Sequence, residues 1–85
     1  MTAYAIPELV ADALEAGIPA SKAFRIFADR SISDVARAAR MEPGRLADIE
    51  AGRRARLDEL TAIGAALHVP AHLLAKGRSR SLAED

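Results

Sequence analysis

A cluster of arginines lies in the stretch "IEAGRRAR", which spans residues 49–56. Arg53, Arg54 and Arg56 fall within four consecutive positions, directly after a glycine. A guanidinium group donates several hydrogen bonds in one plane, a geometry that suits phosphate oxygens. The cluster therefore indicates contacts with an anionic partner such as a nucleic-acid backbone. Taken alone, such a run is more typical of a solvated surface, so the neighbouring elements must decide between the two interpretations.

Two histidines are spaced as zinc ligands would be on one helix face. His68 and His72 lie four residues apart, but Pro70 falls between them and should break that helix, so we expect no metal site. The chain has no cysteine, which excludes disulfides, thiolate metal sites and a cysteine nucleophile. Glu50 has no second acid or histidine at a spacing that suits catalysis. We therefore expect no enzymatic activity and no cofactor.

The composition narrows the class of protein. The chain has 85 residues, which suits one domain, and 51% of them are hydrophobic, which is enough for a compact core. With only two Phe and one Tyr as aromatics, this composition favours closely packed helices over a β-sandwich. The 12 basic and 12 acidic residues cancel, so nucleic-acid binding would depend on how charge is distributed. Neither a membrane span nor a signal peptide is indicated, so we expect a cytoplasmic protein without a membrane partner.

Apolar residues recur at helical spacing along most of the chain, and no alternating pattern of strand length occurs. Ser31 is expected to cap a helix, with Asp34 as its capping-box partner. The predicted helices span residues 7–16, 20–29, 32–39, 43–50, 57–67 and 71–76. The predicted core comprises Leu14, Phe24, Phe27, Val35, Ala36, Leu46, Ile49, Leu60, Ile63, Leu67, Val69 and Leu74. We expect an accessory helix within residues 1–19, a main domain over residues 20–76 and a flexible tail over residues 77–85.

Two short helices meet in the stretch "SISDVARAARMEPGRLADIE", residues 31–50. The small side chain of Ala36 lets these helices approach closely, and Met41 is expected to fill the corner between them. Leu46 and Ile49 should then pack the second helix against the first. Two helices joined by such a short turn form the arrangement in which the second helix can enter a DNA major groove.

This pattern resembles the Cro/phage-repressor helix-turn-helix family, also called the xenobiotic-response-element family. The resemblance covers residues 24–75 and includes the "IEAGRR" ending of the second helix. The matching residues are Ser31, Asp34, Val35, Ala36, Met41, Leu46, Ile49, Glu50, Gly52, Arg53, Leu57, Leu60, Ile63, Leu67, Val69 and Leu74. The stretch "IPELVADALEAG" also resembles the additional N-terminal helix of small stand-alone members, including antitoxin-like ones. The resemblance implies an all-α, five-helix repressor-like domain with an extra N-terminal helix.

The resemblance also implies a sequence-specific transcriptional regulator of the repressor type. Such a protein binds a promoter operator in double-stranded DNA as a homodimer. The residues expected at the DNA are Ser31, Arg40, Gly44, Arg45, Asp48, Arg53 and Arg54. Arg45 and Asp48 would read base edges, and Arg53 and Arg54 would contact phosphates.

Two further expectations concern how the domain is held together. The resemblance implies a structural ion pair between Arg25 of the first core helix and Glu50 of the recognition helix. The N-terminal helix and the last helix flank the predicted core, and we expect apolar residues of one or the other to form the homodimer contacts. Those residues are Leu9, Val10, Leu73 and Leu74.

The chain departs from the family pattern at positions that face the DNA. Arg40 stands where the family usually has a glycine, because the backbone there is left-handed. Ile32 stands where the family often has a glutamine that contacts phosphate. Glu42, Pro43 and Gly44 begin the second helix, where the family usually has side chains that hydrogen-bond to bases.

These departures and the zero net charge keep a second interpretation open. A protein of the same fold could bind another protein, as an antitoxin or antiactivator does, and read bases weakly or not at all. Its partner would then be a toxin or an activator. Ile26 and Ile32, which the helical pattern does not both place in the core, would be candidates for the contact surface.

Overall fold

The computed structural model describes residues 5–75, and all of the regular structure in this range is helical. The longer helices are α1 (Glu8–Glu15), α2 (Ala20–Phe27), α3 (Ile32–Ala39), α4 (Pro43–Glu50) and α5 (Leu57–Leu67). A sixth, short helix covers residues 71–75. The predicted all-α fold is confirmed, and the predicted helix ends agree within two residues wherever the chain is described. The predicted tail over residues 77–85 lies outside the described range, as do residues 1–4 and 76.

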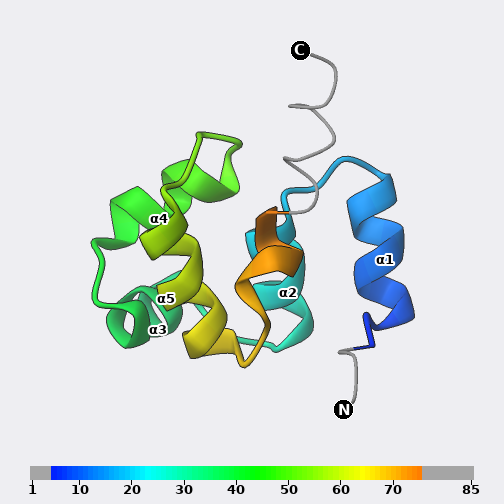
Figure 1. Ribbon diagram of the computed structural model, residues 1–85, viewed down its shortest axis with the longest axis horizontal. Coiled ribbons are helices and arrows are strands. Elements are labelled where there is room, and N and C mark those ends of the chain that lie inside the picture. Colours follow the sequence, from blue (N-terminus) through cyan, green and yellow to red (C-terminus); the bar gives the residue numbers. More distant parts are fainter. Residues whose placement is uncertain (1–4, 76–85) are drawn as a thin grey trace.

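The helices form two groups (Figure 1). Helices α3, α4 and α5 pack together on one side of the molecule, and α1 lies against α2 on the other side. Helix α2 connects the two groups, because it packs against α1 and also against α4 and α5. Helix α4 and the segment that joins it to α5 are therefore remote from α1.

Local sequence accounts for several helix ends. The Ser31 hydroxyl accepts a hydrogen bond of 3.0 Å from the Asp34 backbone N–H, which satisfies an otherwise unpaired donor at the start of α3. Pro43 occupies the first turn of α4, where its missing N–H is not needed. Arg40 and His68 end α3 and α5 with φ values of 58° and 61°. Arg40 therefore adopts the left-handed conformation that the resemblance associates with glycine, at a cost of about 1 kcal/mol.

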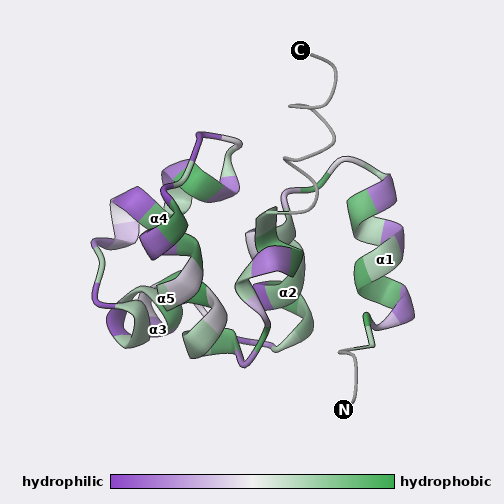
Figure 2. Cartoon of the chain, in the orientation of Figure 1, coloured by the Kyte–Doolittle hydropathy of each residue, from purple (hydrophilic) through white to green (hydrophobic). Residues whose placement is uncertain are grey.

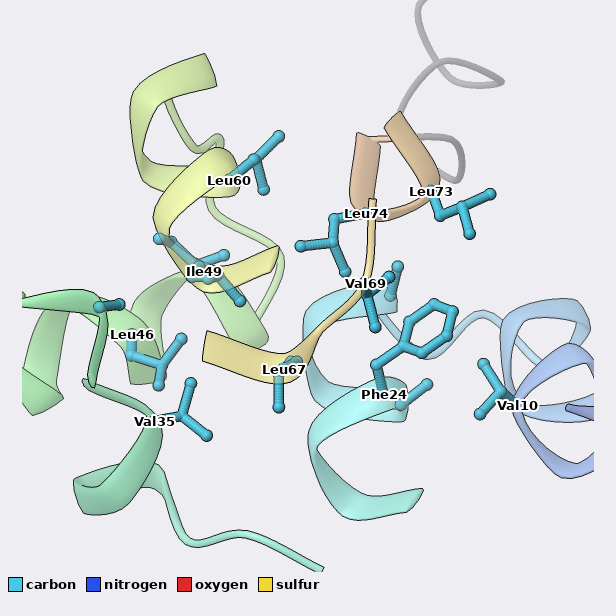
Figure 3. Packing of buried hydrophobic residues seen from close by; sticks show 14 of the residues in the cluster. Val10, Phe24, Val35, Leu46, Ile49, Leu60, Leu67, Val69, Leu73 and Leu74 are labelled. Atoms are coloured by element: carbon cyan, nitrogen blue, oxygen red, sulfur yellow. The ribbon is translucent and has the colours of Figure 1, made fainter. Parts of the chain in front are cut away.

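One hydrophobic core connects the two groups of helices. In Figure 3, Phe24 of α2 lies between Val10 of α1 and Val69, while Leu46 and Val35 lie together between α3 and α4. Hydrophobic residues line the sides of the helices that face one another (Figure 2). The buried apolar residues are Val10, Ala20, Ala23, Phe24, Val35, Ala36, Ala39, Leu46, Ile49, Leu60, Ile63, Leu67, Val69, Leu73 and Leu74.

The predicted core is wrong at Phe27, and Leu14 is only partly buried. Phe27 is 51% exposed, because it is the last residue of α2 and the chain turns away directly after it. Leu14 packs against the edge of the core from α1. The remaining predicted core residues are buried.

The structure buries three of the four residues expected at the dimer contact. Val10 of α1 and Leu73 and Leu74 of the last helix are buried within the single chain. These flanking elements complete the core, and Leu74 belongs to it as predicted. Only Leu9 of that set remains well exposed.

Gly64 allows the chain to reverse tightly after α5. The Val69 N–H donates a hydrogen bond of 2.8 Å to the Gly64 carbonyl oxygen. A Cβ atom at position 64 would collide with the Val69 carbonyl oxygen, which is backbone and cannot simply rotate away. The close approach that places the last helix on the core therefore needs a residue without a side chain.

An ion pair joins α2 to the last residue of α4, as the sequence analysis predicts. The Arg25 Nε and Nη2 atoms donate hydrogen bonds of 2.7 and 3.0 Å to the two carboxylate oxygens of Glu50. Arg25 Nη1 also donates to the Arg30 carbonyl oxygen at 2.7 Å. The side chains of Arg25 and Glu50 are only 13% and 6% exposed. The hydrogen bond with Glu50 is the main reason that the pKa of Arg25 lies above its usual value.

We expect Glu50→Ala to lower the free energy of unfolding by about 3 kcal/mol, because it leaves the guanidinium of Arg25 shielded from water without its partner. Urea unfolding monitored by circular dichroism measures this change. Glu42→Ala is the matched control, because Glu42 is an exposed carboxylate at the start of the same helix and makes no capping hydrogen bond. It should change the stability by less than about 0.5 kcal/mol. Equal effects of the two substitutions would contradict a structural role for the pair.

Candidate nucleic-acid interface

The outward face of α4 carries small side chains. The exposed residues of this face are Gly44, Ala47, Asp48 and Ala51. They are three or four residues apart, which places them on one side of the helix and at its C-terminal end. The opposite side packs into the core. Only Asp48 of this set has a side chain that forms strong hydrogen bonds. Because these side chains are small, a partner with a flat or convex surface can come close to the backbone of α4.

The arginine segment, residues 51–56, follows α4 directly and has no regular structure beyond an initial turn. Hydrophilic residues lie along much of it, at the end of the molecule near α4 (Figure 2). Its residues are exposed except Ala55, which is partly buried against the core. The Arg53 N–H donates a hydrogen bond of 3.0 Å to the Asp48 carbonyl oxygen, which holds the start of the segment against α4. Arg53 and Arg54 are therefore exposed directly after the C-terminal end of α4.

The structure places Arg45 differently from the sequence analysis, which expected it to project towards bases. Arg45 Nε and Nη2 donate hydrogen bonds of 2.8 and 2.7 Å to the two carboxylate oxygens of Glu59 in the first turn of α5. Arg45 Nη2 also donates to the Arg54 carbonyl oxygen at 3.0 Å. The side chains of Arg45 and Glu59 are 32% and 8% exposed. Arg45 is therefore held in an internal ion pair.

Glu59 is a nearly buried carboxylate with several stabilising partners. Besides the pair with Arg45, it accepts a hydrogen bond of 2.9 Å from the Arg56 backbone N–H, which caps the start of α5. The hydrogen bonds from Arg45, followed by the one from the Arg56 N–H, lower the pKa of Glu59 to about 2. The carboxylate is therefore charged across the neutral and mildly acidic range.

Ser31 and Arg40 lie at the two ends of α3. The Ser31 hydroxyl is engaged in capping the helix, although the residue is exposed. Arg40 is exposed and directly precedes the turn into α4. Ile32, at the start of α3, is partly buried against the core. Of the predicted DNA contacts, Gly44 and Asp48 share the outward face of α4, and Arg53 and Arg54 follow the C-terminal end of this helix. Ser31 and Arg40 lie at the two ends of α3.

A shallow hollow beside α4 has a further cationic side chain, that of Lys22, in its lining. It lies between α2, the start of α3 and the second half of α4, and is lined by Lys22, Arg25, Ile32, Ala47, Glu50 and Ala51. Lys22 is exposed, whereas Arg25 and Glu50 pair with each other at the floor. No sequence pattern indicates Lys22, because only the packing of α2 against α4 places it beside this helix. Glu59 also lacks a clear sequence signal, because Arg56, at the N-cap three residues before it, is not one of the usual capping residues.

Other kinds of site find little support in the described residues. Within residues 5–75, no three His, Asp or Glu side chains lie together as a metal site would require. All buried side-chain nitrogen and oxygen atoms in this range have a hydrogen-bond partner. No helix in the same range has the length and apolar character needed to cross a membrane.

Comparison with protein-family models, with curated proteins and with solved structures finds no match to this chain.

We expect the stability contributed by the ion pair of Glu59 to depend on pH in a defined window. The pKa of this carboxyl is about 2 in the folded state and about 4.3 in an unfolded chain. A lowered pKa means that the stabilisation is present above the unfolded value and is lost as the pH falls towards 2. The test compares urea unfolding of the wild type and Glu59→Gln between pH 7 and pH 2. The difference in unfolding free energy should be constant above about pH 5 and shrink below about pH 4. A difference that does not change with pH would show that the charge of Glu59 contributes nothing.

Proposed function

We propose that this protein binds double-stranded DNA as a helix-turn-helix regulator of the Cro/phage-repressor type. In this proposal, α4 is the recognition helix and the arginine segment contacts phosphates. The observation that carries the proposal is the helix pair α3 and α4, joined by a short turn at the left-handed Arg40. The outward face of α4 is exposed, and so are Arg53 and Arg54, which follow this helix. No chemical step and no cofactor are part of this function.

The distribution of charge supports the proposal, although the net charge is zero. Arg53, Arg54 and Arg40 are exposed around α4, and Lys22 lies at the rim of the adjacent hollow. Contacts from such cations to the DNA backbone provide affinity and orient the protein on the duplex. The acidic helix α1 lies on the other side of the molecule, so its charges do not oppose this approach (Figure 1).

We infer that two copies act together on an inverted repeat. One domain of this size provides few DNA contacts, and a two-fold arrangement doubles them. Since Val10, Leu73 and Leu74 are buried within the chain, the contact between copies must use other residues. Leu9, which is exposed on α1, remains a candidate.

The experiment that tests the proposed function is a titration of the protein against DNA from upstream of its own coding sequence and against random DNA. Fluorescence anisotropy at several salt concentrations gives both the affinity and its salt dependence. We expect tighter binding to the upstream DNA and a complex with two protein chains by sedimentation. Equal binding to both DNAs at low salt would contradict a sequence-specific function.

We predict that Arg53→Ala and Arg54→Ala each weaken binding to upstream and random DNA by the same factor. Each substitution should also reduce the slope of log affinity against log salt by about one, because each arginine neutralises one phosphate. The measurement is the same salt series, carried out on each variant.

Arg37→Ala is the matched control for these two variants. Arg37 is an exposed arginine two residues after Val35, which places it on the side of α3 away from the core and α4. Its removal should leave the salt slope unchanged. A loss of slope equal to that of Arg53→Ala would mean that binding follows total charge rather than a defined surface.

We predict opposite effects of Gly44→Ala on stability and on DNA binding. A Cβ atom at position 44 meets open space, so the free protein should gain about 0.5 to 1 kcal/mol from the better helix former. The same methyl group would hold the α4 backbone away from the groove and weaken binding to the upstream DNA. Thermal unfolding and the anisotropy titration measure the two effects separately. Unchanged affinity would show that this part of α4 does not approach DNA closely.

A second candidate function is protein binding, as by an antitoxin or antiactivator of the same fold. The observation that favours it is the exposure of two large apolar residues, Ile26 and Phe27, at the end of α2. Ile32 contributes less than the sequence analysis allowed, because it is partly buried. This function takes the place of the first if the wild type shows no preference for its upstream DNA at low salt.

A further inference from the structure

We propose that Arg45 is a positioning residue of the DNA interface and does not read a base. In this proposal, the ion pair between Arg45 and Glu59 holds the arginine segment in the conformation that contacts phosphates. The inference rests on the proposed function and concerns how the same surface is built.

Backbone hydrogen bonds hold the arginine segment to the rest of the domain near its start, at its middle and at its end. Its start is fixed by the hydrogen bond from the Arg53 N–H to α4. Its middle is fixed by the Arg54 carbonyl oxygen, which accepts a hydrogen bond of 3.0 Å from Arg45. Its end is fixed by the Arg56 N–H, which donates to Glu59 at 2.9 Å. The second attachment uses the guanidinium of Arg45 and the third uses the carboxylate of Glu59. The Arg45–Glu59 pair therefore restrains the second half of the segment, in addition to the packing of Ala55 against the core.

Reading a base would require Arg45 to leave this position. A bidentate contact with a guanine uses two N–H donors of the guanidinium, and the Nε and Nη2 atoms of Arg45 are already bonded to the carboxylate of Glu59. Withdrawal of Arg45 would leave Glu59, which is 8% exposed, as a shielded charge without its main partner. The free energy lost in breaking the pair would offset much of what a base contact provides.

Restraint of the segment before binding should strengthen binding to any DNA sequence. A loop that is already ordered loses less conformational entropy when its side chains engage phosphates. Phosphate contacts carry no sequence information, so the benefit should be the same for every DNA. Loss of the ion pair should therefore raise the dissociation constants for upstream and random DNA by a common factor of about three to ten.

The test uses two substitutions that break the pair from opposite sides. Arg45→Met removes the cation, and Glu59→Gln removes the charge but keeps the shape and one oxygen acceptor, which protects the fold. Backbone amide order parameters of residues 53–56 in the free protein report whether the segment is restrained. They should fall from about 0.85 towards 0.6 in both variants. Both variants should bind upstream and random DNA with the common loss given above, and Arg37→Met, the control, should change neither measurement.

Three results would overturn the proposal. Unchanged order parameters in both variants would show that the pair does not restrain the segment. A loss confined to upstream DNA in Arg45→Met, with Glu59→Gln binding as well as the wild type or better, would show that Arg45 reads a base once released. Lower order parameters with unchanged affinity for both DNAs would show that the restraint has no role in binding. A wild type that binds neither DNA would instead overturn the proposed function, while the order parameters would still decide whether the pair orders the segment.

Discussion

Two arginine–carboxylate pairs, one near each end of α4, determine how this helix lies in the domain. Glu50, its last residue, pairs with Arg25 of α2, and Arg45 in its first turn pairs with Glu59 of α5. A helix of eight residues has little stability of its own, so its position depends on such tertiary contacts and on its buried apolar side. A bidentate pair restrains direction as well as distance. Together with the buried Leu46 and Ile49, the pairs limit rotation of α4 about its axis and so determine which of its residues face outward.

The residues that α4 leaves exposed are mostly small. Such a face offers few hydrogen bonds to base edges, but it allows close approach of the backbone. In the proposed function, affinity would then come from cations around α4 and from the shape of the groove, with few direct base contacts. The arginine segment matters most in this arrangement, because it combines exposed guanidinium groups with a backbone restrained by hydrogen bonds.

A chain of zero net charge can still present a cationic surface if its charges are separated in space. Helix α1 contains Glu8, Asp12 and Glu15 and no basic residue, and it lies on the opposite side of the molecule from the arginine segment (Figure 1). The potential near α4 therefore differs from what the overall composition suggests. The same packing buries Val10 of α1 against Phe24 of α2, which links the acidic helix firmly to the core (Figure 3).

The sequence by itself determined the helices and most of the core. Helix starts and ends depend on neighbours along the chain, such as Ser31 with Asp34, and on apolar spacing, which are both read directly from the residues. The Arg25–Glu50 pair followed from a resemblance and not from spacing. Only the tertiary structure decided that Arg45 pairs with Glu59, that Phe27 is exposed and that Lys22 lies beside α4. These features depend on how the helices pack against one another. The residues near a position in the sequence determine its helix, but they do not determine which residues from other helices lie beside it.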